Sequence, residues 1–445
     1  MNPSLPLQQK ERIFVLDALR GVALCGILIL NMPFFSRAFQ VDFDFRILND
    51  ASTPLDVSSW MTTLFVLGGS FRGMFSMLFG AGALLIISRL EKQSGIEAAD
   101  IYYRRLIWLL VFGLVNAYVL LWPGDILYHY AICGLFLFPL RKSSVRVLVL
   151  LLVFFISINM FKSYLKFTDN IAKRDNGLAA LALKEQKKTL TEEQDGDLKK
   201  WEETLDKQKV ENIRKDVEKE NKAMLQSYPK VWKHLSPLNA KFESSKFYQS
   251  IFFDVMVCVL LGMILYRTGI LTGDKSTLFY FWLMLVGYGV GIGEGVLVGI
   301  AWYNAGLDFY KFIELWPVHV SLYDIHRASV SLGHIGLIML LYKSGFFHGF
   351  LKLYANVGQM AFTNYLSQSM ICTLIFYGYG FGKFGQIGRS EQWYYIIAIW
   401  VFQIIFSNVW LRYFLFGPLE WVWRSLTYWK KQPMLRSKAM ELVLT

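Results

Sequence analysis

Long apolar stretches recur along the chain, each close to the roughly 20 residues that an α-helix needs to cross a bilayer. Polar and basic residues collect between them. This pattern predicts an all-α polytopic membrane helical bundle of about ten transmembrane helices. The predicted spans are 13–34, 60–88, 106–122, 125–140, 146–166, 249–267, 277–303, 325–342, 355–378 and 393–415.

The second predicted span contains five glycines and Arg72 in its middle. Glycine weakens a helix interior and lets other backbones come close, so this span is expected to be broken or steeply tilted, with glycines at close packing contacts.

A charged insertion interrupts the apolar pattern at 167–248. Between Asp169 and Lys222 it carries 13 Lys/Arg and 14 Asp/Glu, so its charges nearly balance. Two helix-forming stretches on either side of 195–197 predict a helical hairpin outside the membrane, either a solvated spacer or a partner-docking arm. The predicted organisation is an N-terminal membrane half 1–166, a periplasmic insertion 167–248, a C-terminal membrane half 249–430 and a cytoplasmic tail 431–445.

Composition supports a membrane protein, because 54% of the 445 residues are hydrophobic and the mean hydropathy is +0.36. The first nine residues are polar, which does not match a cleavable signal peptide. The net charge of +12 comes from basic residues near the ends of alternate spans, which predicts two cytoplasmic termini. The lipid bilayer is therefore the expected partner and nucleic acid is not. The oligomeric state stays open, a homo-oligomer included.

The first span carries three polar side chains that an apolar helix rarely tolerates. Asp17 and Arg20 are three residues apart and share a face. Asn31 follows eleven residues after Arg20, close to three turns and about 16 Å further along the same stripe. Charges in membrane helices usually face the protein interior, a partner or a water-filled cavity. The stripe predicts one wall of a polar site buried in the membrane, with a structural ion pair as the alternative for Asp17 and Arg20.

Other candidates lie toward the predicted outer side. Asp125 and His129 are four residues apart, so the carboxylate could orient the imidazole as a general base. His326 follows Asp324 by two residues and is the second candidate base. For each histidine the alternative is a core histidine with satisfied hydrogen bonds. The further polar residues in the spans are Ser329 and His334 and the lone acids Asp254 and Glu294.

Standard soluble motifs are missing from the sequence. It contains no HExxH, CxxC, GxSxG or phosphate-binding loop, and its four cysteines all lie in apolar runs. The cysteines are expected to be small buried residues, and no metal site is predicted.

Five blocks of sequence, in order along the chain, resemble the YeiB family of bacterial inner-membrane proteins. The resemblance covers nearly all the chain outside the insertion, and it implies a multi-pass protein of the bacterial inner membrane. The blocks are Leu16-Asp17-Ala18-Leu19-Arg20-Gly21 with Asn31, Met74 to Gly82, Gly124-Asp125-Ile126-Leu127, Gly358 to Ser369 and Gly417 to Arg424.

The YeiB family is similar in turn to the transmembrane acyltransferases, which include bacterial glycan O-acetylases and heparan-alpha-glucosaminide N-acetyltransferase. In the O-acetylases an arginine matches Arg20, and a catalytic histidine lies eleven positions after it. This chain has Asn31 at that position. Late in the third span, where relatives often have a histidine, this chain has Asn116. If the chain is an acyltransferase, its base is expected elsewhere in the sequence.

The resemblance implies an acyltransferase that moves an acyl group, such as acetyl, from a cytoplasmic donor to an envelope glycan or lipid-linked sugar. The expected donor is acetyl-CoA or a similar acyl-CoA, with no tightly bound cofactor. Arg20 and Arg72 would bind the donor, Asp17 would hold Arg20, and Asn31 would position the thioester. His129 would be the base with Asp125 as its orienter, and His326 is the second choice. A transporter or flippase for a small anion or lipid, and a non-enzymatic assembly protein, are the alternatives.

Overall fold

The computed structural model describes residues 13–43, 53–94, 97–306, 308–316, 318 and 320–436. These residues form helices and no strand, and a single antiparallel bridge joins Phe414 to Leu435. The predicted all-α fold class is therefore confirmed.

The first part of the chain forms seven α-helices and one π-helix. They are α1 (Phe14–Ser36), α2 (Phe39–Phe43), α3 (Pro54–Met61), η3 (Thr62–Val66), α4 (Ser70–Ser94), α5 (Glu97–Tyr118), α6 (Leu127–Leu135) and α7 (Leu137–Leu140).

The helices that follow reach from the arm to the C-terminal end. They are α8 (Val145–Glu185), α9 (Glu192–Lys207), α10 (Val210–Met224), α11 (Tyr228–Glu243), η4 (Phe247–Ile251), α12 (Phe252–Arg267), α13 (Thr277–Asn304), α14 (Phe309–Leu315), α15 (Tyr323–Ser344), α16 (His348–Gln359), α17 (Ala361–Phe376), α18 (Gln392–Tyr413) and α19 (Pro418–Tyr428).

Seven helical segments of the described chain are long and apolar enough to cross a membrane, which makes this a helical membrane protein. They are Phe14–Ser36, Pro54–Lys92, Val145–Glu185, Tyr228–Arg267, Thr277–Asn304, Tyr323–Ser344 and Gln392–Tyr413. The other three predicted spans lie in α5, in the short helices α6 and α7, and in α16 and α17, which are separate helices on either side of Met360. The count of ten stays a prediction.

The second predicted span is broken, as its glycines indicated. It begins as α3, continues as the π-helical turn η3 and restarts as α4. The break falls at Gly68 and Gly69, and Gly69 has a positive φ of 73°, a backbone conformation that favours glycine. Irregular backbone at membrane depth is tolerated where it is buried or lines a cavity.

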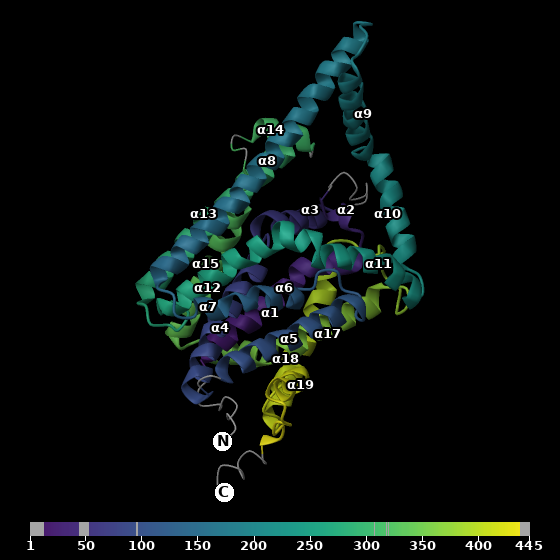
Figure 1. Cartoon of the computed structure of the whole chain (residues 1–445). Coiled ribbons are helices and arrows are strands. Elements are labelled where there is room, and N and C mark those ends of the chain that lie inside the picture. Colours follow the sequence, from purple (N-terminus) through teal and green to yellow (C-terminus); the bar gives the residue numbers. More distant parts are fainter. Residues whose placement is uncertain are drawn as a thin grey trace.

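Helix α1 is the centre of the bundle and packs against α4, α16, α17 and α18 (Figure 1). Its closest crossing is with α16, where Gly21 meets Gly358. A methyl group on Gly358 would lie 1.9 Å from the carbonyl oxygen of Asp17, and one on Gly21 would lie 1.9 Å from that of Tyr354. The two backbones can approach this closely only because neither residue has a side chain.

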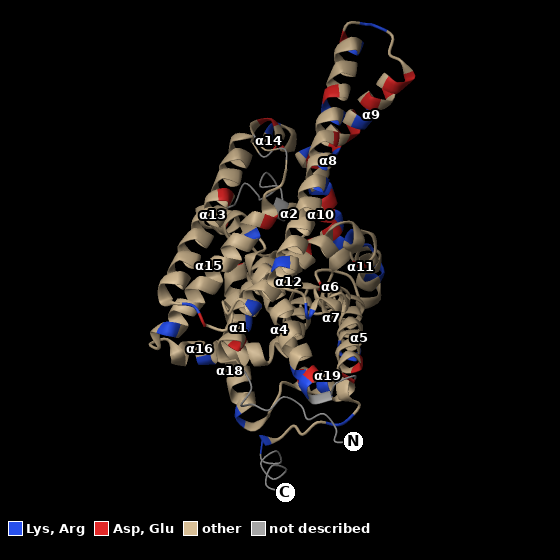
Figure 2. Ribbon diagram, turned by 60° about the vertical axis from the view of Figure 1, so that its left-hand side comes forward, with Lys and Arg blue, Asp and Glu red and all other residues tan. Residues whose placement is uncertain are grey.

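Most of the insertion forms an arm that extends from the bundle, whereas its last helix, α11, packs on the bundle against α5 (Figures 1 and 2). The first helix of the arm is the later part of α8. This helix has 41 residues and is about 60 Å long at 1.5 Å per residue. The predicted position of the turn was wrong. The chain reverses after Glu185, and 195–197 lies inside α9, because Thr191 starts that helix with a capping box to Gln194.

The base of the arm is packed rather than free. Gly177 of α8 receives the Trp201 side chain of α9, and Trp201 makes an edge contact with Tyr310 of α14 at 4.8 Å. Arg174 pairs with Glu314 at 2.7 Å. The arm is therefore a braced projection, and its outer helices α9 and α10 carry most of its mixed charge (Figure 2).

The α1–α16 crossing can be tested with a matched pair of variants in one helix. Gly358→Ala should destabilise the purified protein by roughly 1–3 kcal/mol, because the added methyl group forces two backbones apart. Gly349→Ala in the same helix meets nothing within 4 Å and should leave stability unchanged or slightly increased. Thermal unfolding in detergent measures both, and equal unfolding midpoints for the two variants would contradict the close crossing.

Candidate functional site

Two cavities lie along α1 and α4 at opposite ends of the bundle. The first, here the arginine cavity, is lined by Asp17, Arg20, Arg89, Arg105, Glu420 and Arg424 around an apolar interior, and its volume is about 260 Å³. The second, here the histidine cavity, is lined by Asn31, Arg72, Glu294, Tyr323, His326 and Arg389 among aromatic rings, and its volume is about 690 Å³. The arginine cavity borders α19, and the histidine cavity borders α14 at the arm end (Figure 1).

The cavities are close neighbours on α4. Arg72 lines one and Phe75, a single turn later, lines the other. On α1 their nearest lining residues, Arg20 and Ile27, are seven positions apart, about 10 Å along the helix. The layer between them is packed, because Ser76 bonds to the Tyr130 hydroxyl at 2.7 Å and a methyl group on Gly26 would overlap the Phe71 ring.

The arginine cavity has an excess of positive side chains. Four arginines and two acids line it. Arg20 pairs with Asp17 at 3.0 Å, which confirms the predicted pairing, and its guanidinium also lies against Gly82 of α4. The predicted donor-binding residues Asp17 and Arg20 thus lie in the same cavity.

Both carboxylate oxygens of Glu420 are engaged in hydrogen bonds to the start of α17. One of its carboxylate oxygens accepts hydrogen bonds from the amides of Phe362 and Thr363 at 2.8 and 3.0 Å, and the other accepts from the Thr363 hydroxyl. It therefore caps the start of α17, where a negative charge is favourable. Arg105 differs, since its guanidinium stacks on Trp423 at 3.6 Å and makes no hydrogen bond or ion pair within the described residues.

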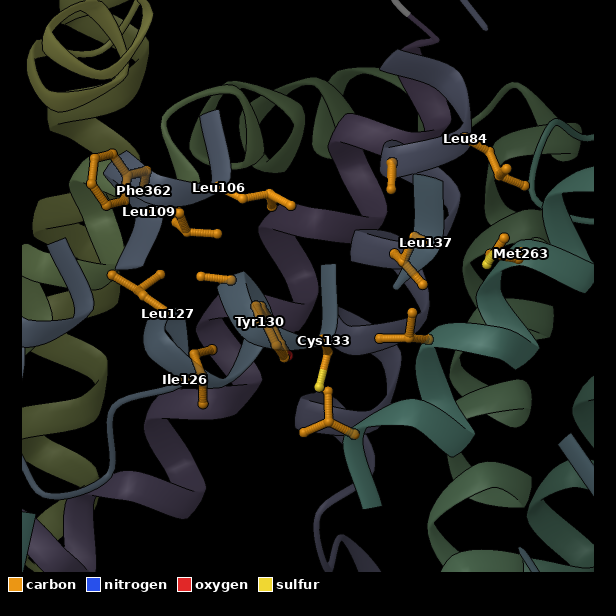
Figure 3. Packing of buried hydrophobic residues seen from close by; sticks show 14 of the residues in the cluster. Leu84, Leu106, Leu109, Ile126, Leu127, Tyr130, Cys133, Leu137, Met263 and Phe362 are labelled. Carbon is orange, nitrogen blue, oxygen red and sulfur yellow. The ribbon is translucent and has the colours of Figure 1, made fainter. Parts of the chain in front are cut away.

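The interior of the arginine cavity is apolar. Figure 3 shows Leu106, Leu109, Leu127 and Tyr130 grouped beside Phe362, and all five also line the cavity. An apolar chamber with arginines at its edge suits a ligand that has an anionic end and an apolar or uncharged end.

His326 and Glu294 form the polar centre of the histidine cavity. The histidine is only 4% exposed, and its Nδ1 lies 3.0 Å from a Glu294 carboxylate oxygen and 2.8 Å from the Gly291 carbonyl oxygen. The Gly291 carbonyl accepts the hydrogen bond from Nδ1, so Nδ1 carries the proton and Nε2 holds the lone pair, and the Glu294 carboxylate lies beside the same nitrogen. Nε2 is buried and has no hydrogen-bond partner within the described residues. An imidazole that is fixed by a backbone carbonyl, has a carboxylate beside it and keeps a lone pair on its other nitrogen suits a general base.

A buried network of charges supports this cavity. Asp254 of α12 accepts from Arg72 at 2.7 Å and also from Arg327. Arg327 bonds to Asp324 at 2.7 Å, and Asp324 accepts from Asn159 of α8 at 2.8 Å. Asp324, which sequence reasoning considered as a partner of His326, is therefore engaged with Arg327. The network ties α4, α8, α12 and α15 together.

Two further polar residues line the histidine cavity from its edges. Asn31 ends the stripe of α1 and so lies apart from Asp17 and Arg20, in the other cavity. Arg389 comes from the loop before α18. Burial, followed by the neighbouring charge of Arg37, lowers the pKa of Arg389 to about 9.

The structure does not join Asp125 to His129 as predicted. Asp125 accepts from the Asn116 amide at 2.8 Å and from the Tyr128 backbone at 2.8 Å, so it closes the turn at the start of α6. His129 stacks on Phe247 at 5.2 Å, and its Nε2 is buried without a partner in the described part of the chain. Neither residue lines either cavity.

His334 has a fixed structural environment. Ser70 donates its hydroxyl proton to the Leu67 carbonyl at 2.6 Å, so His334 Nε2 donates to Ser70 at 3.1 Å and Nδ1 accepts from Tyr288 at 2.9 Å. The ring also stacks on Phe71 at 4.4 Å. Both nitrogens are used, and this histidine is a satisfied core residue.

Sequence reasoning noted Glu294 only as a lone acid and did not find its partner. The two residues are 32 positions apart on different helices, and glycines of α13 let α15 pack closely enough to join them. An acid within the glycine-rich apolar run of α13 is the sequence feature that could have indicated the His326–Glu294 pair. Within the described residues no group of three or more His, Cys, Asp or Glu could hold a metal ion.

Comparison with known proteins places this chain among uncharacterised relatives. Residues 265–430 match the family described as "Protein of unknown function (DUF418)". The chain is 30% identical to Uncharacterized protein YxaH of Bacillus subtilis, over 98% of this chain and 99% of the relative. It is 28% identical to Uncharacterized protein YeiB of Escherichia coli, over 94% and 96%.

No solved structure matches the chain significantly. The similarity to YxaH extends over almost the full length of both proteins, and the DUF418 match falls in the C-terminal membrane half. On these matches, the chain belongs to the YeiB family of DUF418 proteins.

Proposed function

We propose that this protein is a membrane-embedded acyltransferase that moves an acyl group, such as acetyl, from a cytoplasmic donor to an envelope glycan or lipid-linked sugar. The observation that carries the proposal is the His326–Glu294 pair, which lines a cavity large enough for a sugar and leaves Nε2 without a hydrogen-bond partner among the described residues. His326 takes the role of base in place of His129, because His129 lines neither cavity.

The reaction uses the pair as a proton carrier. Nε2 of His326 removes the proton from an acceptor hydroxyl or amine, and the acceptor atom attacks the thioester carbonyl carbon. The carbon–sulfur bond then breaks and the leaving thiolate takes the proton from Nε2. Glu294 stabilises the imidazolium that forms between these steps.

The donor would enter through the arginine cavity. Its four arginines suit the phosphates of acetyl-CoA or a similar acyl-CoA. Arg20 would bind a phosphate, with Asp17 holding its guanidinium, and Arg105 would add a second cation. The apolar interior would take the uncharged arm, which has to cross the packed layer near Phe75 and Tyr130 to bring the thioester to His326. Asn31 and Arg72 line the cavity on that far side.

The proposal includes a location and an orientation. The bundle would lie in the bacterial inner membrane with both termini and the arginine cavity on the cytoplasmic side, and the histidine cavity and arm on the periplasmic side. Support comes from the Lys and Arg residues around α16 and α19, at the end opposite the arm (Figure 2). Basic residues favour the cytoplasmic side of a membrane protein.

A transporter or flippase for a small anion or lipid is the second candidate. The specific observation in its favour is the packed layer between two cavities that border opposite ends of the bundle. Alternating access uses such an arrangement. Thioester turnover without net solute flux in proteoliposomes supports the transferase, and flux without turnover supports the transporter.

The base can be assigned by comparing two histidine variants. His326→Gln should lower the rate of acyl transfer about 10²–10⁴-fold while donor affinity stays near that of the wild type. Glu294→Gln should give a smaller loss, and the double variant should be little worse than His326→Gln, because residues acting as a unit are not additive. His129→Gln is the matched control and should retain activity. A deep loss in His129→Gln with normal His326→Gln would return the role to α6.

The arginine cavity can be tested by donor affinity. Arg105→Gln and Arg20→Lys should each weaken donor binding, because one loses a charge and the other replaces a planar guanidinium by a point charge. Arg412→Gln, in the last turn of α18 and outside the cavity lining, is the control. The dissociation constant of a non-hydrolysable acetyl-CoA analogue measures the effect. Unchanged affinity in both cavity variants would remove the donor from this cavity.

The orientation can be tested by labelling, because all four native cysteines are buried. Cysteines introduced at Gly196 and Gln386 should react with an impermeant thiol reagent in intact spheroplasts. One introduced at Lys430 should react only after the membrane is opened, since it lies beside α19 at the predicted cytoplasmic end. Labelling of the Lys430 variant from outside would overturn the proposed topology.

A further inference from the structure

The break before α4 brings a helix start to the unpartnered nitrogen of His326. Gly68 and Gly69 line the histidine cavity, and a methyl group added to Gly68 would lie 3.3 Å from His326 Nε2. The nitrogen is therefore aimed at the backbone that precedes the 25-residue helix α4.

Some backbone amides at the start of α4 make no backbone hydrogen bond within the described residues. The Ser70 amide bonds to the Leu67 carbonyl at 2.8 Å and the Gly73 amide to the Gly69 carbonyl at 2.8 Å. No backbone bond of this kind runs from the amides of Gly68 and Gly69 in the part of the chain that the structure describes. Such amides at a helix start attract a negative charge.

Two side chains complete the donor set. Arg72, the third residue of α4, extends one nitrogen to Asp254 at 2.7 Å and another to the Tyr323 hydroxyl at 3.2 Å. The Tyr323 hydroxyl accepts that bond and keeps its own proton. It also sits over the backbone break, because a methyl group on Gly69 would lie 2.1 Å from it.

We propose that the start of α4 at Gly68 and Gly69, with Arg72 and the Tyr323 hydroxyl, is an anion subsite facing His326 Nε2. This inference rests on the proposed acyl transfer for its chemical role. The thioester carbonyl oxygen becomes an oxyanion that is held by these hydrogen-bond donors. Meanwhile Nε2 carries the proton that it took from the acceptor hydroxyl or amine. When the carbon–sulfur bond breaks, the carbonyl re-forms and the proton passes to the thiolate. Donors fixed in advance around such an oxygen are a strong source of rate enhancement.

The subsite can be detected without any turnover, with inorganic phosphate as a tetrahedral anion. Diethyl pyrocarbonate modifies imidazole nitrogens that carry a lone pair, and peptide mass spectrometry follows its reaction at His326 in the purified full chain. Phosphate should protect His326 in the wild type. Tyr323→Phe should weaken that protection about 10-fold or more, since it removes one hydrogen bond to a charged group, and Arg72→Gln should weaken it further.

Matched controls separate the subsite from general effects. Tyr288→Phe also loses one hydroxyl, from a tyrosine that bonds His334 outside the cavity, and should keep wild-type protection. Arg72→Gln leaves Asp254 paired with Arg327. A His326 that resists modification, or protection that is equal in the wild type and Tyr323→Phe, would overturn the subsite.

The outcome for the subsite is independent of the outcome for the proposed function. Phosphate protection with the expected variant pattern, but no acyl transfer, keeps the anion subsite and removes the transferase chemistry. Acyl transfer with normal kcat and KM in Tyr323→Phe keeps the transferase and removes the subsite. With both in place, Tyr323→Phe should lower kcat with little change in KM, because the oxyanion exists only in the transition state and intermediate.

Discussion

A charge inside an apolar bundle must have a partner, and this requirement governs how the helices of the protein meet. Asp254 collects Arg72 and Arg327, and Arg327 in turn holds Asp324. With Asn159 of α8, which donates to Asp324, this cluster joins four helices around the histidine cavity. Leaving one member uncompensated would be strongly destabilising. The polar site therefore depends on the same contacts that fix the helix packing there.

The charges around each cavity are arranged differently, which suggests different ligands. Around the histidine cavity and its supporting network, the acids Glu294, Asp254 and Asp324 equal in number the arginines Arg72, Arg327 and Arg389. His326 Nε2 has no hydrogen-bond partner among the described residues. In the arginine cavity cations outnumber acids, and Glu420 is occupied as the cap of α17. A neutral acceptor beside a base suits the first arrangement, and a phosphate-bearing donor suits the second.

The sequence predicted those features that depend on neighbours along the chain. The glycines of the second span predicted its break, and the three-residue spacing predicted the Asp17–Arg20 pair. Local spacing failed for Asp125 and His129, because Asp125 bonds the backbone of its own turn and Asn116. Spacing along one helix also could not show that Arg20 and Asn31 line different cavities. The His326–Glu294 pair depends on the packing of α13 against α15, a long-range contact that no single stretch reveals.

The proposed acyl transfer by the His326–Glu294 pair can be tested directly by mass spectrometry of lipids and envelope glycans. Cells with the wild-type protein, with Glu294→Gln at equal abundance, and without the protein would be compared. A lipid or glycan species heavier by one acyl group is expected in the wild type, and its amount should fall with Glu294→Gln. Identical profiles with and without the protein, or an acylated species unaffected by Glu294→Gln, would contradict it.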